Sequence, residues 1–202
     1  MRTLFASVCF VFLMGSLFVR ADDSGLSQHL LDMPDYTQGI AVMPRADADG
    51  GLVVALATNS GFLVYAQHTN DAVVQAVAER AGANGVLNST VYASMGEATQ
   101  LQLPDDYADF LVMTELVDSE LSGSLLTEVR RVASPNGLVV LGAEGATGLT
   151  EVALTNWLIS GGVTSYSVTN DAFGLWASFS EPRDAREDDW SYWYHGTDGN
   201  PV

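Results

Sequence analysis

The stretch GIAVMPRADADGGLVVALATNSGFLVYA, residues 39–66, decides the fold class. Residues 40–43 are apolar and typical of a buried strand, and so are residues 62–66. Residues 51–58, between them, fit either a strand or a helix. As a strand they would be followed only by the short segment 59–61, which would force a hairpin. As a helix they complete a strand–helix–strand unit, which is the unit of a parallel sheet.

The next segment favours the helix. Asn70-Asp71 is a good helix N-cap, apolar side chains then recur on one helical face, and Gly82 stops the pattern. The alternation continues, with strands predicted at 86–93, 110–113 and 138–141, helices at 125–132 and 149–160, a turn at 134–137, and a hairpin of 163–169 with 174–179 across Asn170-Asp171. Strands that alternate with amphipathic helices indicate an α/β domain. We therefore expect a Rossmann-like, doubly wound sheet, mostly parallel, with a C-terminal antiparallel hairpin.

The N-terminal end of the chain predicts export. Arg2 is followed by an apolar run at residues 4–19 and by Ala21, a small residue suited to signal cleavage. An uncleaved membrane anchor is the alternative for this run. We expect residues 1–21 to be a signal peptide, so that the protein is exported to the periplasm or the extracellular space without membrane attachment. Residues 22–38 are then a lead-in to the domain.

The charge and the content of cysteine and histidine argue against several functions. The chain has 25 acidic and 8 basic residues and a net charge of −17, so it repels nucleic-acid backbones and anionic membranes. Cys9, the single cysteine, lies in the predicted signal, which leaves no disulfide in the mature chain. The three histidines lack the spacing of metal ligands. We expect no nucleic-acid partner and no metal site, and we assign no catalytic residue.

Two motifs carry a resemblance to a known family. Gly96-Glu97-Ala98, then Leu103-Pro104 and residues 108–112, are similar to the pattern GDA..LP....FDLV of the class I methyltransferases that use S-adenosylmethionine (SAM). Residues 128–132 and 135–137, EVRRV and PNG, resemble the E..RVL.PGG join of the same family. The resemblance is to its type 11-like members and extends in order over residues 39–142. It implies the class I methyltransferase fold and SAM as the cofactor.

The resemblance also implies which residues would contact SAM. In the family the first strand ends in an acid that binds the ammonium of the cofactor, and a G-x-G-x-G turn follows it. Pro44 stands at the position of that acid, and alanines replace two of the three glycines. The ribose-binding acid of the family corresponds to His68, and its adenine-contacting carboxylate corresponds to Glu97. The candidate cofactor-binding residues are Ala46, Ala48, Asp49, Gly50, His68, Glu97 and Ala98.

The residues of the loop that follows the first strand predict a weakened cofactor site. Alanine disfavours the positive φ that glycine adopts, and it adds a methyl group where the cofactor approaches the backbone. Arg45 places a positive charge beside the expected sulfonium and ammonium. Asp47 or Asp49 is expected to cap the following helix. His68 is either a single hydrogen-bond partner of the ribose or a polar residue at a strand end, and Glu97 is either an adenine contact or an exposed loop acid.

The C-terminal segment carries a second, narrower resemblance. Residues 181–189 form a charged linker, and residues 188–202, DDWSYWYHGTDGNPV, resemble the segment that joins a methyltransferase-like domain to a PQQ-like β-propeller in some secreted bacterial proteins. This implies a methyltransferase-like domain at 39–180, a linker and tail at 181–202, and a propeller partner in cis or in trans. Since the chain stops where the propeller would begin, we expect either a fragment or a protein that has lost its second half.

Three functions are open at this point. The first is a non-catalytic scaffold or docking module of an exported protein, with the methyltransferase fold and a degenerate SAM site. The alternative is an active SAM-dependent methyltransferase of unknown acceptor. The third is the binding of another small molecule in the same crevice, because such sheets bind ligands at the carboxyl ends of their strands.

Overall fold

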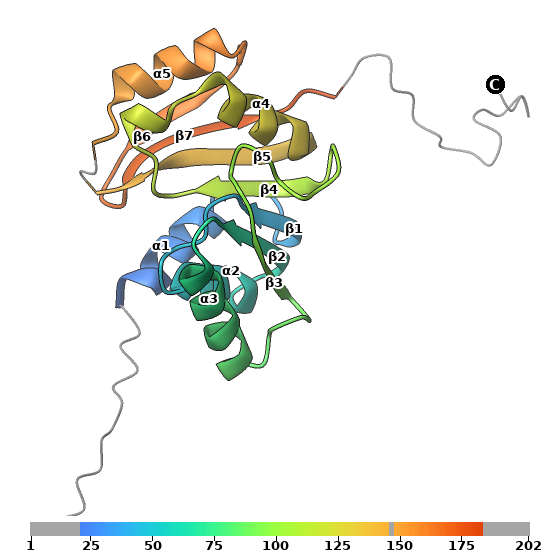
Figure 1. Cartoon of the computed structure of the whole chain (residues 1–202). Coiled ribbons are helices and arrows are strands. Elements are labelled where there is room, and N and C mark those ends of the chain that lie inside the picture. Colours follow the sequence, from blue (N-terminus) through green and yellow to red (C-terminus); the bar gives the residue numbers. More distant parts are fainter. Residues whose placement is uncertain (1–20, 146–147, 184–202) are drawn as a thin grey trace, which may run out of the picture.

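The structure is a computed structural model that describes residues 21–145 and 148–183 (Figure 1). The predicted signal up to residue 20 and the aromatic tail lie outside the described residues. The strands are β1 (Gln38–Met43), β2 (Gly61–His68), β3 (Val91–Met95), β4 (Ala108–Met113), β5 (Ala133–Glu144), β6 (Ser167–Asn170) and β7 (Gly174–Ser180). The helices are α1 (Ala21–Leu31), α2 (Gly51–Thr58), α3 (Asp71–Ala83), the 3-10 turn η1 (Asp118–Glu120), α4 (Gly123–Val132) and α5 (Glu151–Ser160).

All the strands of the described residues form one seven-stranded sheet in the order β3-β2-β1-β4-β5-β7-β6. The pairs β1–β2, β2–β3, β1–β4 and β4–β5 are parallel. β7 runs antiparallel to both of its neighbours, β5 and β6. The predicted fold class is therefore confirmed, including the C-terminal hairpin. The strand order reverses direction between β1 and β4, which is where doubly wound sheets bind their ligands.

Helices cover both faces of the sheet (Figure 1). Successive side chains of a strand point to opposite faces, so Phe110 of β4 packs in the core on the side of α1, α2 and α3. Its neighbour Leu111 packs in the core on the side of α4 and α5. Because both faces are buried, the central strands are apolar almost throughout, as is usual for parallel sheets.

Residues 51–58 form helix α2, so the strand–helix–strand interpretation is correct and the hairpin alternative is wrong. α2 contacts the sheet strand β2 and also the two helices beside it, α1 and α3. Its buried side chains, which include Leu52, Val53 and Leu56, therefore occur all round the helix. This explains why its sequence has no polar face and resembles a strand.

The segment 22–38, expected to be a lead-in, contains helix α1. Leu26 and Leu30 of α1 are buried in the core beside α2. His29 stacks on Phe173 with a distance of 4.5 Å between ring centroids, which joins α1 to the hairpin at the far end of the chain. No helix of residues 21–145 and 148–183 is long and apolar enough to cross a membrane.

Two predicted boundaries are wrong because a left-handed residue lies within each segment. Residues 86–90 belong to a tight turn with Asn88 at φ 56°, so β3 begins only at Val91. Residues 134–137 were expected to be a free turn but lie within β5. There, the pairing with β4 shifts between Ala108 and Phe110, and Asn136 adopts φ 64°. The extra residues form a bulge, which a strand can contain without ending.

Candidate functional site

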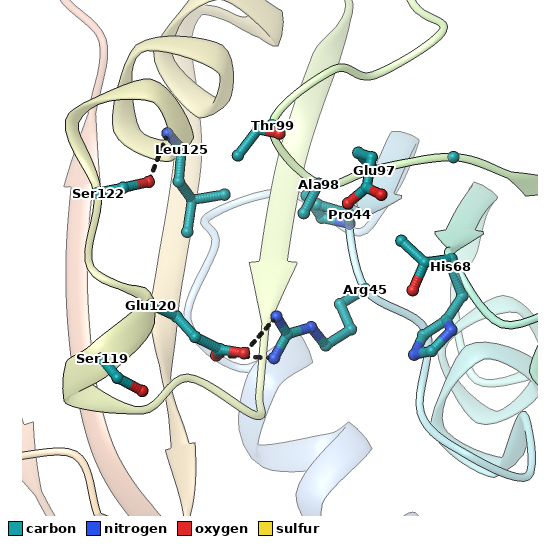
Figure 2. A pocket seen from close by; sticks show the side chains of 12 residues that line it. Pro44, Arg45, His68, Glu97, Ala98, Thr99, Ser119, Glu120, Ser122 and Leu125 are labelled. Atoms are coloured by element: carbon teal, nitrogen blue, oxygen red, sulfur yellow. Dashed lines mark hydrogen bonds and ion pairs between the residues drawn. The ribbon is translucent and has the colours of Figure 1, made fainter.

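Two cavities open at the carboxyl ends of the central strands. The first, of about 350 Å³, lies between the segments that follow β1, β2 and β3 on one side and the segment from η1 to α4 on the other (Figure 2). The second, also of about 350 Å³, lies between α1, the loop after β1 and the ends of β4 and β5. The two cavities flank the point where the strand order reverses, so this is the candidate site of the molecule.

The predicted cofactor-binding residues divide among these places. His68, Glu97 and Ala98 line the first cavity, together with Pro44 and Arg45 (Figure 2). Ala48 and Asp49 line the second cavity. Ala46 and Gly50 line neither cavity. Ala46 is buried, and its backbone N–H donates to the carbonyl of Gln67 at 2.9 Å.

Arg45 forms an ion pair across the crevice. Its guanidinium donates two hydrogen bonds to the carboxylate of Glu120, at 2.8 and 2.9 Å (Figure 2). It donates a third, at 3.0 Å, to the carbonyl of Glu115. Glu120 belongs to η1, which follows β4, whereas Arg45 follows β1. The ion pair therefore joins the two sides of the first cavity, which both residues line. A bidentate pairing of this kind holds both side chains in fixed positions.

The loop after β1 caps helix α2 with its own carboxylates. Asp47 accepts the N–H groups of Leu52 at 3.1 Å and Val53 at 3.2 Å, and Asp49 accepts that of Gly51 at 3.1 Å. The prediction that Asp47 or Asp49 caps this helix is confirmed for both residues. Burial raises the pKa of Asp47 to about 6, partly offset by the two backbone hydrogen bonds. The neighbouring Asp49 has a lowered pKa, because hydrogen bonds from Asp47, Gly51 and Arg80 outweigh its burial.

Gly50 has a structural task in this loop. It adopts φ 71° at the N-cap of α2, a left-handed conformation that glycine supplies without strain. A Cβ atom added there would lie 2.7 Å from the Cα of Val77 in α3. Gly50 thus permits the close packing of α2 against α3, a role that involves no ligand.

Gln67 is a site residue that the sequence reasoning missed. It is fully buried near the end of β2, and its amide donates to the carbonyls of Glu97 at 2.8 Å and Gln100 at 3.2 Å. A side chain on Gly96 would collide with it, because a Cβ atom there would lie 2.3 Å from Nε2 of Gln67. Gln67 therefore positions the 96–100 segment at the first cavity. The available signal was a lone amide inside an apolar strand.

His68, the next residue, is held by its own loop. Its Nδ1 accepts the backbone N–H of Asn70 at 2.9 Å. Asn70 in turn caps α3 by accepting the N–H of Ala72, as the sequence predicted. One ring nitrogen of His68 is thus already engaged, and Nε2 is the nitrogen left to face the first cavity.

The residues of the second motif, Glu128 and Arg131, stabilise the fold around the segment 101–105. Glu128 accepts the N–H of Leu101 at 2.6 Å and pairs with Arg131. Arg131 also donates to the carbonyl of Leu103 at 3.0 Å and to the carboxylate of Asp105 at 2.6 Å. These interactions fasten α4 to the segment that leads into β4, away from either cavity.

Comparison with known proteins agrees with this architecture. Residues 48–141 match the family described as Methyltransferase domain. The fold is that of the class I methyltransferases. The methyltransferase-like fold predicted from the family resemblance is thus confirmed. Among the curated proteins none matches the chain.

Three solved structures illustrate the similarity. A proposed SAM-dependent methyltransferase of Methanococcus maripaludis has a TM-score of 0.70 at 18% identity, over 84% of this chain and 90% of that one. A SAM-dependent methyltransferase of Aquifex aeolicus has a TM-score of 0.64 at 18% identity, over 78% and 89%. Geranyl diphosphate C-methyltransferase of Streptomyces coelicolor, in complex with Mg²⁺, geranyl diphosphate and S-adenosyl-L-homocysteine, has a TM-score of 0.61 at 13% identity, over 73% and 63%.

Proposed function

We propose that this chain is a methyltransferase-like domain with a degenerate SAM site, and that it serves an exported protein as a non-catalytic scaffold or docking module. The observation that carries the proposal is the ion pair of Arg45 with Glu120. In the family pattern an acid at the end of β1 receives the ammonium of SAM. In this chain Pro44 replaces that acid, and the next side chain is a cation engaged across the crevice.

Two further contacts support the loss of cofactor binding. The N-terminal N–H groups of α2, which point to ligand anions in many nucleotide-binding folds, are already accepted by Asp47. His68 replaces the ribose-binding acid, and it has one ring nitrogen for a ribose where a carboxylate offers two oxygens. We derive no methyl-transfer step for this chain, because its β1 loop does not fit the cofactor.

A second candidate function, SAM-dependent methyl transfer to an unknown acceptor, is favoured by one observation. Glu97 and Ala98 line the first cavity at the position where the family binds adenine. The related fold in Streptomyces coelicolor carries the demethylated cofactor in its structure. For this function the Arg45–Glu120 ion pair would have to open when SAM binds.

The export and partner parts of the proposal rest on sequence features beyond the described residues. The apolar N-terminal run supports secretion, and the aromatic tail supports association with a PQQ-like β-propeller in cis or in trans. A domain that no longer uses a cytoplasmic cofactor is compatible with a location where that cofactor is not made.

Calorimetric titration of the purified protein with SAM tests the proposal. We expect no binding heat with SAM at about 1 mM, which corresponds to a binding free energy weaker than about −4 kcal/mol. The informative variant is Pro44→Asp combined with Arg45→Gly, which restores the acid and removes the cation. Arg130→Met, which removes a cation that pairs with Glu181 and lines neither cavity, is the control. A micromolar dissociation constant for the unmodified protein would overturn the proposal and establish the second candidate.

A further inference from the structure

The connection between α3 and β3 carries a sequence pattern that the proposed function does not use. Residues 88–90 are Asn-Ser-Thr, which is the acceptor pattern Asn-x-Ser/Thr for N-linked glycans. Every other asparagine of the chain lacks a serine or threonine two positions later. The pattern is expected in surface loops of exported proteins, so the position of Asn88 in the structure decides whether it can serve as an acceptor.

The structure places Asn88 in an exposed turn. The sequence predicts a strand over residues 86–93, but Asn88 adopts the left-handed φ of 56° and is exposed to solvent. The N–H groups of Ser89 and Thr90 close the turn by donating to the carbonyl of Val86 at 3.3 and 3.1 Å. The side chain of Asn88 makes no hydrogen bond or ion pair with any residue of the described chain. A group attached to its amide would therefore displace no contact of the fold.

The hydroxyl of Thr90 is an independent observation that points to the same use. Its Oγ1 is buried and has no hydrogen-bond partner among the described residues. A buried hydroxyl without a partner is unfavourable. Valine has the same branched shape without the hydroxyl, so the folded domain gives no reason for a threonine at this position. The acceptor pattern does give one, because it requires a hydroxyl two residues after the asparagine. Since this hydroxyl is buried in the fold, the pattern is available to an enzyme before the domain folds.

The turn leads into a strand at the edge of the sheet. β3 is first in the strand order and pairs with β2 alone among the described strands. A free edge of this kind allows two molecules to pair and aggregate. The hydroxyl of Tyr92 donates to the carbonyl of Asn88 at 3.1 Å, and both Tyr92 and Met95 of β3 are exposed. A glycan on Asn88 would lie beside this edge and its apolar side chains, where it would hinder such pairing.

We propose that Asn88 is the acceptor of an N-linked glycan, attached while the chain is exported. The donor is an oligosaccharide joined to a polyprenyl diphosphate. A bond forms between Nδ2 of Asn88 and the anomeric carbon of the first sugar, and the bond from that carbon to the diphosphate oxygen breaks. The diphosphate leaves with the electron pair and the amide nitrogen loses one proton, so nothing is oxidised or reduced. The proposal rests on the export part of the proposed function and does not depend on the SAM site.

The experiment is expression of the full chain in a eukaryotic cell whose secretory pathway attaches N-linked glycans. We expect slower migration of the chain in denaturing electrophoresis, reversed by peptide N-glycosidase. That enzyme converts a glycosylated asparagine to aspartate, so peptide mass spectrometry should find the conversion at Asn88. Asn88→Gln and Thr90→Val should each abolish the modification, whereas Thr90→Ser, which keeps the hydroxyl, should retain it. Asn84→Gln, at an exposed asparagine of the same connection without the pattern, is the control and should leave the modification unchanged.

Two further measurements separate the acceptor site from folding and from export. The unglycosylated Thr90→Val protein, made in the bacterial cytoplasm, should unfold at no lower temperature than the unmodified sequence, because the hydroxyl has no partner to lose. Replacement of residues 1–21 by a secretory signal of established function tests the acceptor site without this chain's own N-terminal segment. Glycosylation only with that signal would support the acceptor site and refute export by residues 1–21.

An unmodified Asn88 with both signals would overturn the proposal, and so would a glycan that persists in Asn88→Gln. Binding of SAM in the calorimetric titration would refute the proposed non-catalytic role and would leave this result unchanged.

Discussion

Replacement of Gly50 by alanine should destabilise the domain by about 2–5 kcal/mol. Gly50 has φ 71°, and a residue with a side chain pays roughly 1–2 kcal/mol for that left-handed conformation. The new Cβ atom would also lie 2.7 Å from the Cα of Val77. Because the atom it meets is backbone, no side-chain rotation relieves the contact, and α2 and α3 must move apart. Overpacking of this kind costs about 1–3 kcal/mol.

Gly85→Ala is the matched control. Gly85 also has φ 71°, but no atom of the described residues would lie within 4 Å of its added Cβ. It should therefore pay only the conformational cost, roughly 1–2 kcal/mol. Thermal unfolding followed by circular dichroism measures both, and a loss of 1 kcal/mol corresponds to about 2–4 °C for a domain of this size. Equal losses in the two variants would refute the reasoning, since the collision with Val77 would then contribute nothing.

Three further predictions concern polar groups. Asp47→Asn should flatten the pH dependence of the free energy of unfolding between about pH 4 and 6. The pKa of Asp47 is raised to about 6 in the fold, so the folded state binds more protons than the unfolded state in this range and its stability falls as the pH rises. Urea unfolding over this pH range measures the slope. Arg131→Lys should cost about 1–2 kcal/mol, read from the urea midpoint, because lysine cannot reproduce the bidentate contact with Glu128. Gln67→Leu should leave the carbonyls of the 96–100 segment without donors, at a cost of about 1–3 kcal/mol, and hydrogen exchange should show faster opening of that segment.

Most of the fold could be predicted from the sequence, because the lengths of the apolar segments and the spacing between them indicate which segments are strands and which are helices. The short segment 59–61 left a hairpin or a helical crossover as the alternatives, the helix signals that follow it favoured the crossover, and the observed α2 agrees. The apolar runs predicted the central strands correctly, because both faces of the sheet are buried and its central strands are apolar on both sides. α1 was missed because its contacts, such as His29 on Phe173, join segments far apart in the chain. No local pattern reports such contacts.

The candidate site was predictable only in part. Family spacing placed His68, Glu97 and Ala98 at one cavity, where the structure has them. Ala46 and Gly50, which the same spacing assigns to the cofactor, line neither cavity: Ala46 is buried, and Gly50 lies where α2 packs against α3. The partner of Arg45 could not be predicted, because Glu120 is distant in sequence and meets Arg45 only through the packing of β1 beside β4.

The contacts of Glu128 and Arg131 bear on how such a protein evolves. These two residues belong to a motif by which the methyltransferase fold is identified, yet they fasten α4 to the segment 101–105 and touch no ligand cavity considered above. Natural selection for a stable fold is enough to retain them, whatever becomes of the cofactor. A protein with this fold can therefore lose methyl transfer and still keep the sequence motif, because some residues of the motif stabilise the fold and take no part in catalysis.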